Sequence, residues 1–309
     1  MIKFFNLHDD IGSDIFEHRI EQPNRLDDYH YPKMKQGGID TTAIVCCFSS
    51  SETWQDMMEQ VLYINASIER SEHYSFGYDK DIRVFIALEG MCGIRDQVRE
   101  KIQWLYQHNV RMASLCWNDH NALACGAKSG NMPLSDLGIQ CIEAMNEVHM
   151  AIDVSHCCEW NFYDIQRIST TPILATHSNV KGLFNHYRNL SDPQIQVLQE
   201  HGGILGALPV RWFVTRDESK QTLKEFIKII DYIKERFGTQ LIALGFDFMD
   251  YMDDPTCMVK ELDSVAHIQN LANQLLEHGY SQEEVETICF GNANRYMESY
   301  LIYENEEGK

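Results

Sequence analysis

The chain has 309 residues, of which 44% are hydrophobic and 23% charged, and this ordinary globular composition excludes a disordered or fibrous protein. A formal net charge of -20 argues against a nucleic-acid partner, because neutralising phosphates requires a surplus of Lys and Arg. No apolar run approaches the roughly 20 residues that span a bilayer, and the N-terminal residues lack the apolar core of a signal peptide. We therefore expect a cytoplasmic protein that does not associate with membranes.

The ten cysteines do not form the pattern of a disulfide-rich protein or of a zinc finger. Several lie inside apolar runs, among them Cys46, Cys47 and Cys116, and no C-x-x-C with zinc-finger spacing occurs. We expect them to be buried, reduced thiols, as is usual in a cytoplasmic protein.

Eight short apolar runs recur along the chain, separated by segments with helical periodicity. The runs are Ile2–Leu7, Thr42–Phe48, Arg83–Leu88, Val110–Cys116, Met150–Ser155, Pro172–Thr176, Gly203–Leu208 and Leu241–Phe246. Most are too apolar to be half-exposed strands with alternating faces. Strands buried on both faces are typical of a parallel sheet covered by helices.

Helical patterns lie between these runs and after the last one. They include a helix around Glu52–Ser67, a face formed by Val98, Ile102 and Leu105, a second face formed by Leu137, Cys141, Met145 and Val148, a stripe from Leu223 to Phe237 that ends at Gly238, a helix over about Val259–His278 that ends at Gly279, and a capping box at Ser281–Glu284. The alternation favours a (β/α)₈ TIM-like barrel with additional C-terminal helices, and a doubly wound open sheet is the alternative. No linker or internal repeat interrupts residues 1–309, so we expect one domain.

Acidic and histidine side chains stand at the ends of five of the predicted strands. They are His8 and Asp10, Glu89, His156, His177, and Asp247. Residues i and i+2 of an extended segment share a face, so the first two point the same way. In a barrel these positions meet at one mouth and form an N/O-rich site that suits zinc or a similar divalent ion. Each position alone has a simpler interpretation, such as a helix cap at Asp247 or a solvated turn at Glu89.

Several motifs, taken in order, resemble the membrane (renal-type) dipeptidase family over nearly the whole chain. The motifs are His8-x-Asp10, Leu88-Glu89-Gly90, Asn118 to Ala122, Ile152-Asp153-Val154-Ser155-His156, Ala175-Thr176-His177-Ser178-Asn179, Arg188-Asn189-Leu190, Gly245-Phe246-Asp247-Phe248 and Gly291-Asn292-Ala293-Asn294-Arg295. Any one of them is a weak signal, and together they are specific.

The resemblance implies two divalent metal ions, with zinc as the expected ion. By position, His8 and Asp10 resemble the ligands of the first ion and Glu89 the residue that bridges the two. His156 and His177 resemble the ligands of the second ion. The family's fold is a barrel, and a homodimer is implied as well.

Two further positions resemble family residues that act on the substrate. Asp247 resembles the catalytic acid/base carboxylate, and Arg188 resembles the arginine that binds the free carboxylate of a dipeptide. The implied reaction is hydrolysis of the dipeptide amide bond by a hydroxide that bridges the metals, with Asp247 and Glu89 as catalytic residues.

The chain departs from the family at two substrate-binding positions. Trp117 stands where a histidine that contacts the scissile carbonyl is expected. Either His120 replaces that histidine or the metals alone polarise the carbonyl, and the simpler interpretation of Trp117 is an aromatic wall of the pocket. The family's tyrosine after the seventh strand has no counterpart, since Trp212 and Phe213 lack the hydroxyl.

These departures leave two alternatives to a dipeptidase. The first is a related two-metal hydrolase of another amide, a lactone or a phosphoester, and the second is a non-catalytic metal-binding barrel.

Overall fold

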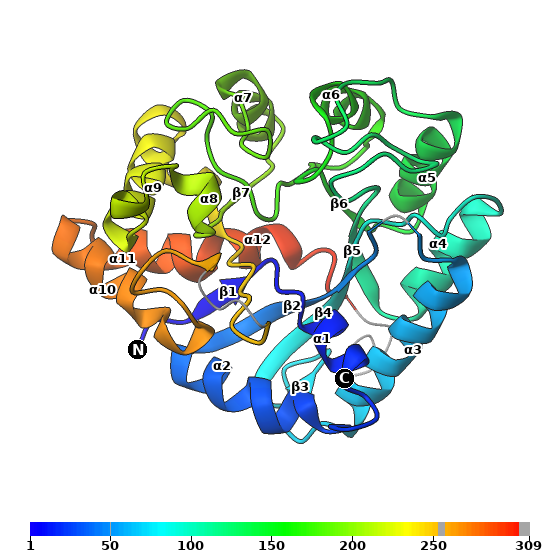
Figure 1. The fold of residues 1–309 in the computed structure, drawn as a ribbon, viewed down its shortest axis with the longest axis horizontal. Coiled ribbons are helices and arrows are strands. Elements are labelled where there is room, and N and C mark those ends of the chain that lie inside the picture. Colours follow the sequence, from blue (N-terminus) through cyan, green and yellow to red (C-terminus); the bar gives the residue numbers. More distant parts are fainter. Residues whose placement is uncertain (50, 253–256, 303–309) are drawn as a thin grey trace.

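The computed structural model describes residues 1–49, 51–252 and 257–302 of the chain. Its main sheet is parallel, with strands in the order β1 (Phe4–Asn6), β2 (Ile39–Cys47), β4 (Ile82–Glu89), β5 (Val110–Ser114) and β6 (Ala151–Asp153). A two-residue strand, β3 (Tyr74–Ser75), pairs with the first two residues of β4. The strands β7 (Leu205–Ala207) and β8 (Ile242–Leu244) form a second parallel pair. The strands lie at the centre of the molecule with helices around them (Figure 1).

Two connections close these sheets into a barrel. Leu174 pairs in parallel with Asp153 of β6, and the adjacent Ala175 pairs in parallel with Leu205 of β7. On the other side, the backbone N–H of Leu7 donates to the carbonyl of Leu244, at 3.0 Å. The predicted barrel is therefore confirmed, and the doubly wound open sheet was wrong because such a sheet keeps two free edges.

The strand predictions differ from the structure at two places. The predicted strand 172–176 occupies the sixth barrel position, but it joins its neighbours only through isolated bridges. The strand β3 was not predicted, because two residues are too short to show a period. Each of the other seven predicted runs contains or overlaps a strand of the barrel.

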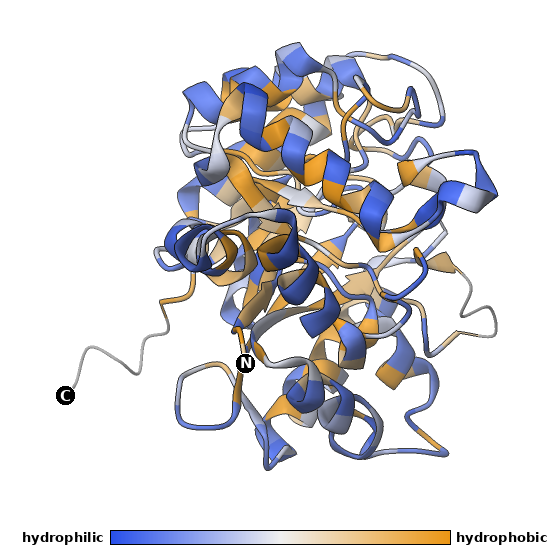
Figure 2. Ribbon diagram, turned by 90° about the vertical axis from the view of Figure 1, so that its left-hand side faces the viewer, coloured by the Kyte–Doolittle hydropathy of each residue, from blue (hydrophilic) through white to orange (hydrophobic). Residues whose placement is uncertain are grey.

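The described part of the chain contains twelve α-helices. They are α1 (Ile11–Glu17), α2 (Tyr31–Gly37), α3 (Trp54–Arg70), α4 (Val98–Gln107), α5 (Asp136–Glu147), α6 (Glu159–Ile168), α7 (Asp192–Glu200), α8 (Arg211–Val214), α9 (Leu223–Phe237), α10 (Gln269–His278), α11 (Gln282–Glu286) and α12 (Asn292–Met297). Their hydrophobic residues gather towards the interior and their hydrophilic residues lie outside (Figure 2). None of the described helices is both long and apolar enough to cross a membrane.

Helix ends follow the predicted capping residues, with one exception. Gly238 and Gly279 end α9 and α10 with positive φ angles of 89° and 107°, and Ser281 opens α11 in a capping box. The helix predicted over 259–278 begins only at Gln269. Its first residues bond to other segments instead, since the N–H groups of Val259 and Lys260 donate to the carbonyls of Pro209 and Gln221.

The barrel interior is packed and closed at one end. Phe5, Val45, Phe85 and their neighbours on the strands form a buried apolar cluster with residues of α12 and the segment after it, including Met297 and Leu301. Helix α12 contacts both β1 and β8. Because this end is filled, the accessible mouth lies at the carboxyl ends of the strands, where the predicted site residues stand.

Candidate metal centre

The Glu89 carboxylate lies at the centre of the strand-end residues. Its Oε1 atom is 2.7 Å from Nε2 of His156, 3.2 Å from Nε2 of His177 and 3.4 Å from Nε2 of His8. The two histidines that follow β6 and the sixth barrel position also approach each other, with 2.8 Å between their Nε2 atoms. All four side chains are at least 95% buried. The structure thus brings together residues that lie as far as 169 positions apart, from 8 to 177.

Hydrogen bonds on the outer ring nitrogens fix the tautomers of two of these histidines. Nδ1 of His156 lies 3.1 Å from the side-chain oxygen of Asn118, which is an acceptor. Nδ1 of His177 lies 2.8 Å from Oγ1 of Thr176, whose own hydrogen goes to Asp153 Oδ2 at 2.8 Å. Both Nδ1 atoms therefore carry the hydrogen, and both Nε2 atoms present lone pairs to the centre.

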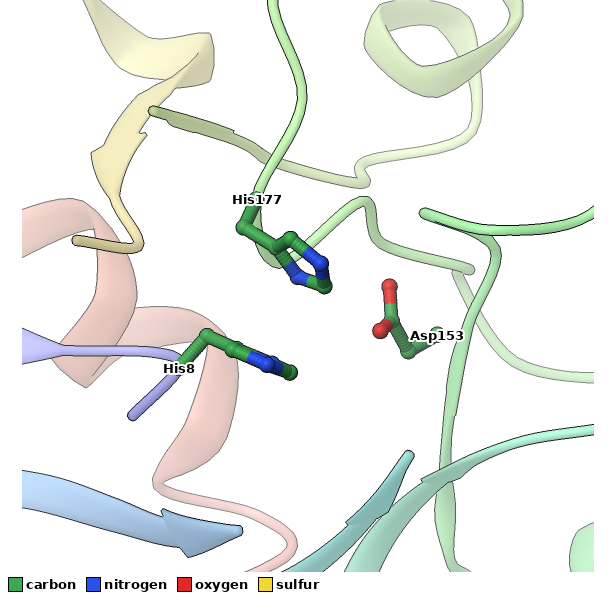
Figure 3. A group of neighbouring side chains, drawn as sticks. All are labelled: His8, Asp153 and His177. Carbon is green, nitrogen blue, oxygen red and sulfur yellow. The ribbon is translucent and has the colours of Figure 1, made fainter. Parts of the chain in front are cut away.

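Asp153 supports the histidines rather than binding at the centre. Its carboxylate accepts from the backbone N–H groups and the hydroxyls of Ser155 and Thr176, so its oxygens are already engaged. Figure 3 shows its carboxylate beside the neighbouring rings of His8 and His177, whose centroids are 3.7 Å apart. The ligand-type atoms of these three residues lie within 4.8 Å of one another.

The electrostatics of the cluster fit a bound cation. Burial lowers the pKa of His156 to about 4 and holds that of His177 well below its usual value, so both rings are neutral. The surrounding histidines hold the pKa of Glu89 well below its ordinary range despite burial. An ionised carboxylate thus lies among buried imidazole nitrogens, and this combination of donors suits a divalent ion.

Two buried atoms near Glu89 lack hydrogen-bond partners, which again fits a metal site. They are Nε2 of His8 and Oδ1 of Asp10, which lie 3.7 Å apart. Nitrogen and carboxylate oxygen donors together suit zinc and similar divalent ions. The ligand-type atoms of His8, Asp10 and Asp247 also lie within 4.8 Å of one another.

Asp247 is held beside the cluster by an unusual backbone conformation. Its φ angle is 53°, in the left-handed region that few non-glycine residues adopt, and its N–H donates to the carbonyl of His8 at 3.0 Å. Burial raises the pKa of Asp247 to about 6, which places the carboxylate in the range of a general base near neutral pH.

A cavity of about 680 Å³ opens onto the cluster. Its lining includes Asp10, Cys47, Glu89, Trp117, Asn118, His156, Arg188, Trp212, Phe213, Asp247, Met249 and Tyr251. The lining combines the acidic side chains of Asp10, Glu89 and Asp247 with the buried guanidinium of Arg188. Such a cavity is large enough for a small zwitterionic molecule.

Arg188 lines the cavity next to His156 and His177. Its Nη2 donates to the carbonyl of His177 at 3.1 Å and lies 3.0 Å from Nε2 of His156, and its Nη1 donates to the carbonyl of Ser155. Its Nε has no partner although the residue is only 2% exposed. An unsatisfied N–H on a buried guanidinium can bind an incoming carboxylate.

The remaining predicted substrate residues divide between the cavity and the surface. Trp117 lines the cavity, and its ring centroid is 6.2 Å from that of His156. Trp212 and Phe213 line it as well, in α8 and without a hydroxyl. His120 is exposed, does not line the cavity, and donates its backbone N–H to Ser129.

Sequence reasoning missed two cavity residues that carry reactive groups. Cys47 is half-buried rather than fully buried, and its Sγ lies within 4.8 Å of ligand-type atoms of Asp10 and Glu89. It stands at the end of β2, so the strand-end rule applied to it too. Tyr251 places a buried hydroxyl without a partner on the cavity, and no spacing in the sequence marked it.

The chain is similar to one known protein family and to several known proteins over most of its length. The model of the membrane dipeptidase family (peptidase family M19) matches residues 5–307. An uncharacterized protein in the pqqA 5' region of Klebsiella pneumoniae is 31% identical over 245 residues, which cover 76% of this chain and 86% of that protein. Dipeptidase tcpJ of Claviceps purpurea is 24% identical over 279 residues, covering 86% of this chain and 64% of the longer relative.

Solved structures share the fold over almost the whole chain. The dipeptidase AC, a metallopeptidase of family M19, superposes with a TM-score of 0.85 at 18% identity, covering 96% of this chain and 98% of that one. A metallopeptidase from Rhodobacter sphaeroides superposes with a TM-score of 0.83 at 17% identity, covering 96% and 99%. That structure holds a phosphinate mimic of the dipeptide L-Ala-D-Ala. At such identities the likeness shows the fold.

Proposed function

Since this chain belongs to the membrane dipeptidase family (peptidase family M19), a family of metallopeptidases, we propose that it hydrolyses dipeptides at a centre of two divalent ions, with zinc the expected ion. One observation carries the proposal: the lone pairs of two neutral histidines converge on the buried carboxylate of Glu89. Imidazole nitrogens and a carboxylate oxygen at such short separations form a ligand set for divalent ions.

In the proposed centre, His8 and Asp10 would bind the first ion and His156 and His177 the second. Glu89 would be a ligand of both. Bound divalent ions supply Lewis-acid chemistry, because they polarise a carbonyl oxygen and lower the pKa of water towards about 7. Asn118 and the Thr176–Asp153 pair keep the histidine rings in the tautomer that binds a metal through Nε2.

Two residues are proposed to act on the substrate. Arg188 binds the free carboxylate of the dipeptide through its unpaired N–H, which confines the enzyme to short substrates with a free C-terminus. Asp247 accepts the proton of the attacking water and returns it to the leaving nitrogen, and its raised pKa suits both steps. Trp117 is proposed to be an aromatic wall of the cavity rather than a proton donor.

Hydrolysis assays on four substrate classes test the proposal. The purified protein, loaded with zinc, is compared on dipeptides, N-acyl amino acids, lactones and phosphodiesters. Preference for dipeptides supports the assignment. Preference for another class shows that the tryptophan at position 117 and the missing tyrosine hydroxyl have changed the substrate, and no hydrolysis of any class favours a non-catalytic barrel. The homodimer stays a prediction.

A further inference from the structure

Strand register places the thiol of Cys47 beside the central carboxylate. In the parallel pairing of β2 with β4, Cys47 is the partner of Glu89, and Cys46 is the partner of Leu88. Because successive side chains point to opposite faces of a strand, only one of the two adjacent cysteines faces the centre. The N–H of Cys47 donates to Oγ of Ser13 at 2.9 Å, which anchors this strand end to α1.

The carboxylates of Asp10 and Glu89 lie close both to the thiol of Cys47 and to the imidazole of His8. Sγ of Cys47 and carboxylate oxygens of Asp10 and Glu89 lie within 4.8 Å of one another. Nε2 of His8, with its side chain 3% exposed and without a hydrogen-bond partner, lies 3.7 Å and 3.4 Å from those residues. The four residues together therefore offer nitrogen, oxygen and sulfur donors of the kinds that zinc binds.

We propose that Cys47 is a thiolate ligand of the ion held by His8, Asp10 and Glu89. On binding, the sulfur–metal bond forms and the thiol proton is released to solvent, without change of oxidation state. A sulfur donor makes this position softer than a site of nitrogen and oxygen alone. The position then favours zinc, cobalt and cadmium over magnesium and manganese. The inference rests on the proposed metal centre and adds a ligand to it.

Cobalt substitution tests the assignment independently of activity. The protein is stripped of metal with a chelator and titrated with Co²⁺ while its absorption spectrum is recorded. Coordination by sulfur gives an intense sulfur-to-cobalt charge-transfer band in the near ultraviolet, whereas nitrogen and oxygen ligands give only weak visible bands. We expect the intense band in the wild type and its loss in Cys47→Ser, with cadmium binding weakened on the order of 10- to 100-fold.

Cys157→Ser is the matched control. Cys157 is also half-buried and is adjacent to His156, but its Sγ points to the carbonyl of Val154, at 3.1 Å. This variant is expected to keep the band. Cobalt binding with visible bands but no charge-transfer band in the wild type overturns the role of Cys47 alone. Absence of cobalt binding overturns the proposed function itself, and this inference with it.

Discussion

Nδ1 of His177 lies 2.8 Å from Oγ1 of Thr176, the residue before it in the chain. The threonine hydroxyl donates to Asp153, so it can only accept from the imidazole. This contact places the hydrogen of His177 on Nδ1, so Nε2, which faces Glu89, keeps the lone pair that a metal ligand needs. Asn118 has the same effect on His156.

Removal of the Thr176 hydroxyl is expected to weaken metal binding. In Thr176→Val the N–H of His177 loses its acceptor, and zinc affinity should fall by roughly 10- to 100-fold in a competition titration with a chelator. Thr171→Val is the control, because the Thr171 hydroxyl lies in the same segment and has no partner. Equal zinc affinity in Thr176→Val and the control would show that the contact does not support the metal.

Replacement of Arg188 is expected to affect only substrates with a free carboxylate. In Arg188→Met, kcat/KM for a dipeptide should fall by roughly 10- to 100-fold, since a charge-assisted hydrogen bond is lost. On the same dipeptide with a C-terminal amide, Arg188→Met and the wild type should have equal kcat/KM values. Equal losses on both substrates would mean that the residue acts on the structure of the site and not on the carboxylate.

Asp247→Asn is expected to separate proton transfer from metal binding. The amide cannot accept the proton, so kcat should fall by roughly 100- to 10,000-fold, while elemental analysis still finds the metal content of the wild type. If metal and activity are lost together, the carboxylate is a ligand, as its position near His8 and Asp10 would also allow.

His30 provides a prediction for stability against pH. Burial lowers the pKa of His30, which faces Asp14, Arg25 and Asp250, below its usual value. The unfolded chain, with a histidine pKa of about 6.5, then binds more protons than the folded one below that pH, so stability is present above pH 6.5 and is lost as pH falls. Denaturant unfolding of His30→Gln should show a smaller loss of stability between pH 7 and pH 5 than the wild type. An identical pH dependence would contradict this role.

The barrel and its mouth could be predicted from the sequence because they depend on local patterns. Apolar runs predict buried strands, and residues just after them, such as Glu89 and His177, gather at one end of a parallel barrel. The sixth strand position was also recognised, although it forms isolated bridges and no continuous ladder. The helix predicted from 259 was wrong over its first ten residues, because hydrogen bonds from the backbone amides of Val259 and Lys260 to distant carbonyls outweighed local periodicity.

The supporting contacts could not be predicted in the same way. Asn118 meets His156 across 38 positions, and Thr176 depends on Asp153 for its orientation. Such contacts follow from how loops pack in three dimensions. Cys47 differs, since its strand-end position was visible in the sequence but its apolar surroundings suggested a buried thiol.

The proposed function depends on Glu89 as a shared ligand of two divalent ions. Its most direct test is the number of divalent ions per chain, measured by elemental analysis of the wild type and Glu89→Ala together with dipeptide hydrolysis. Two ions per chain in the wild type, and loss of both metal and activity in the variant, are predicted. Full metal content and full activity in Glu89→Ala would show that this carboxylate is not a metal ligand.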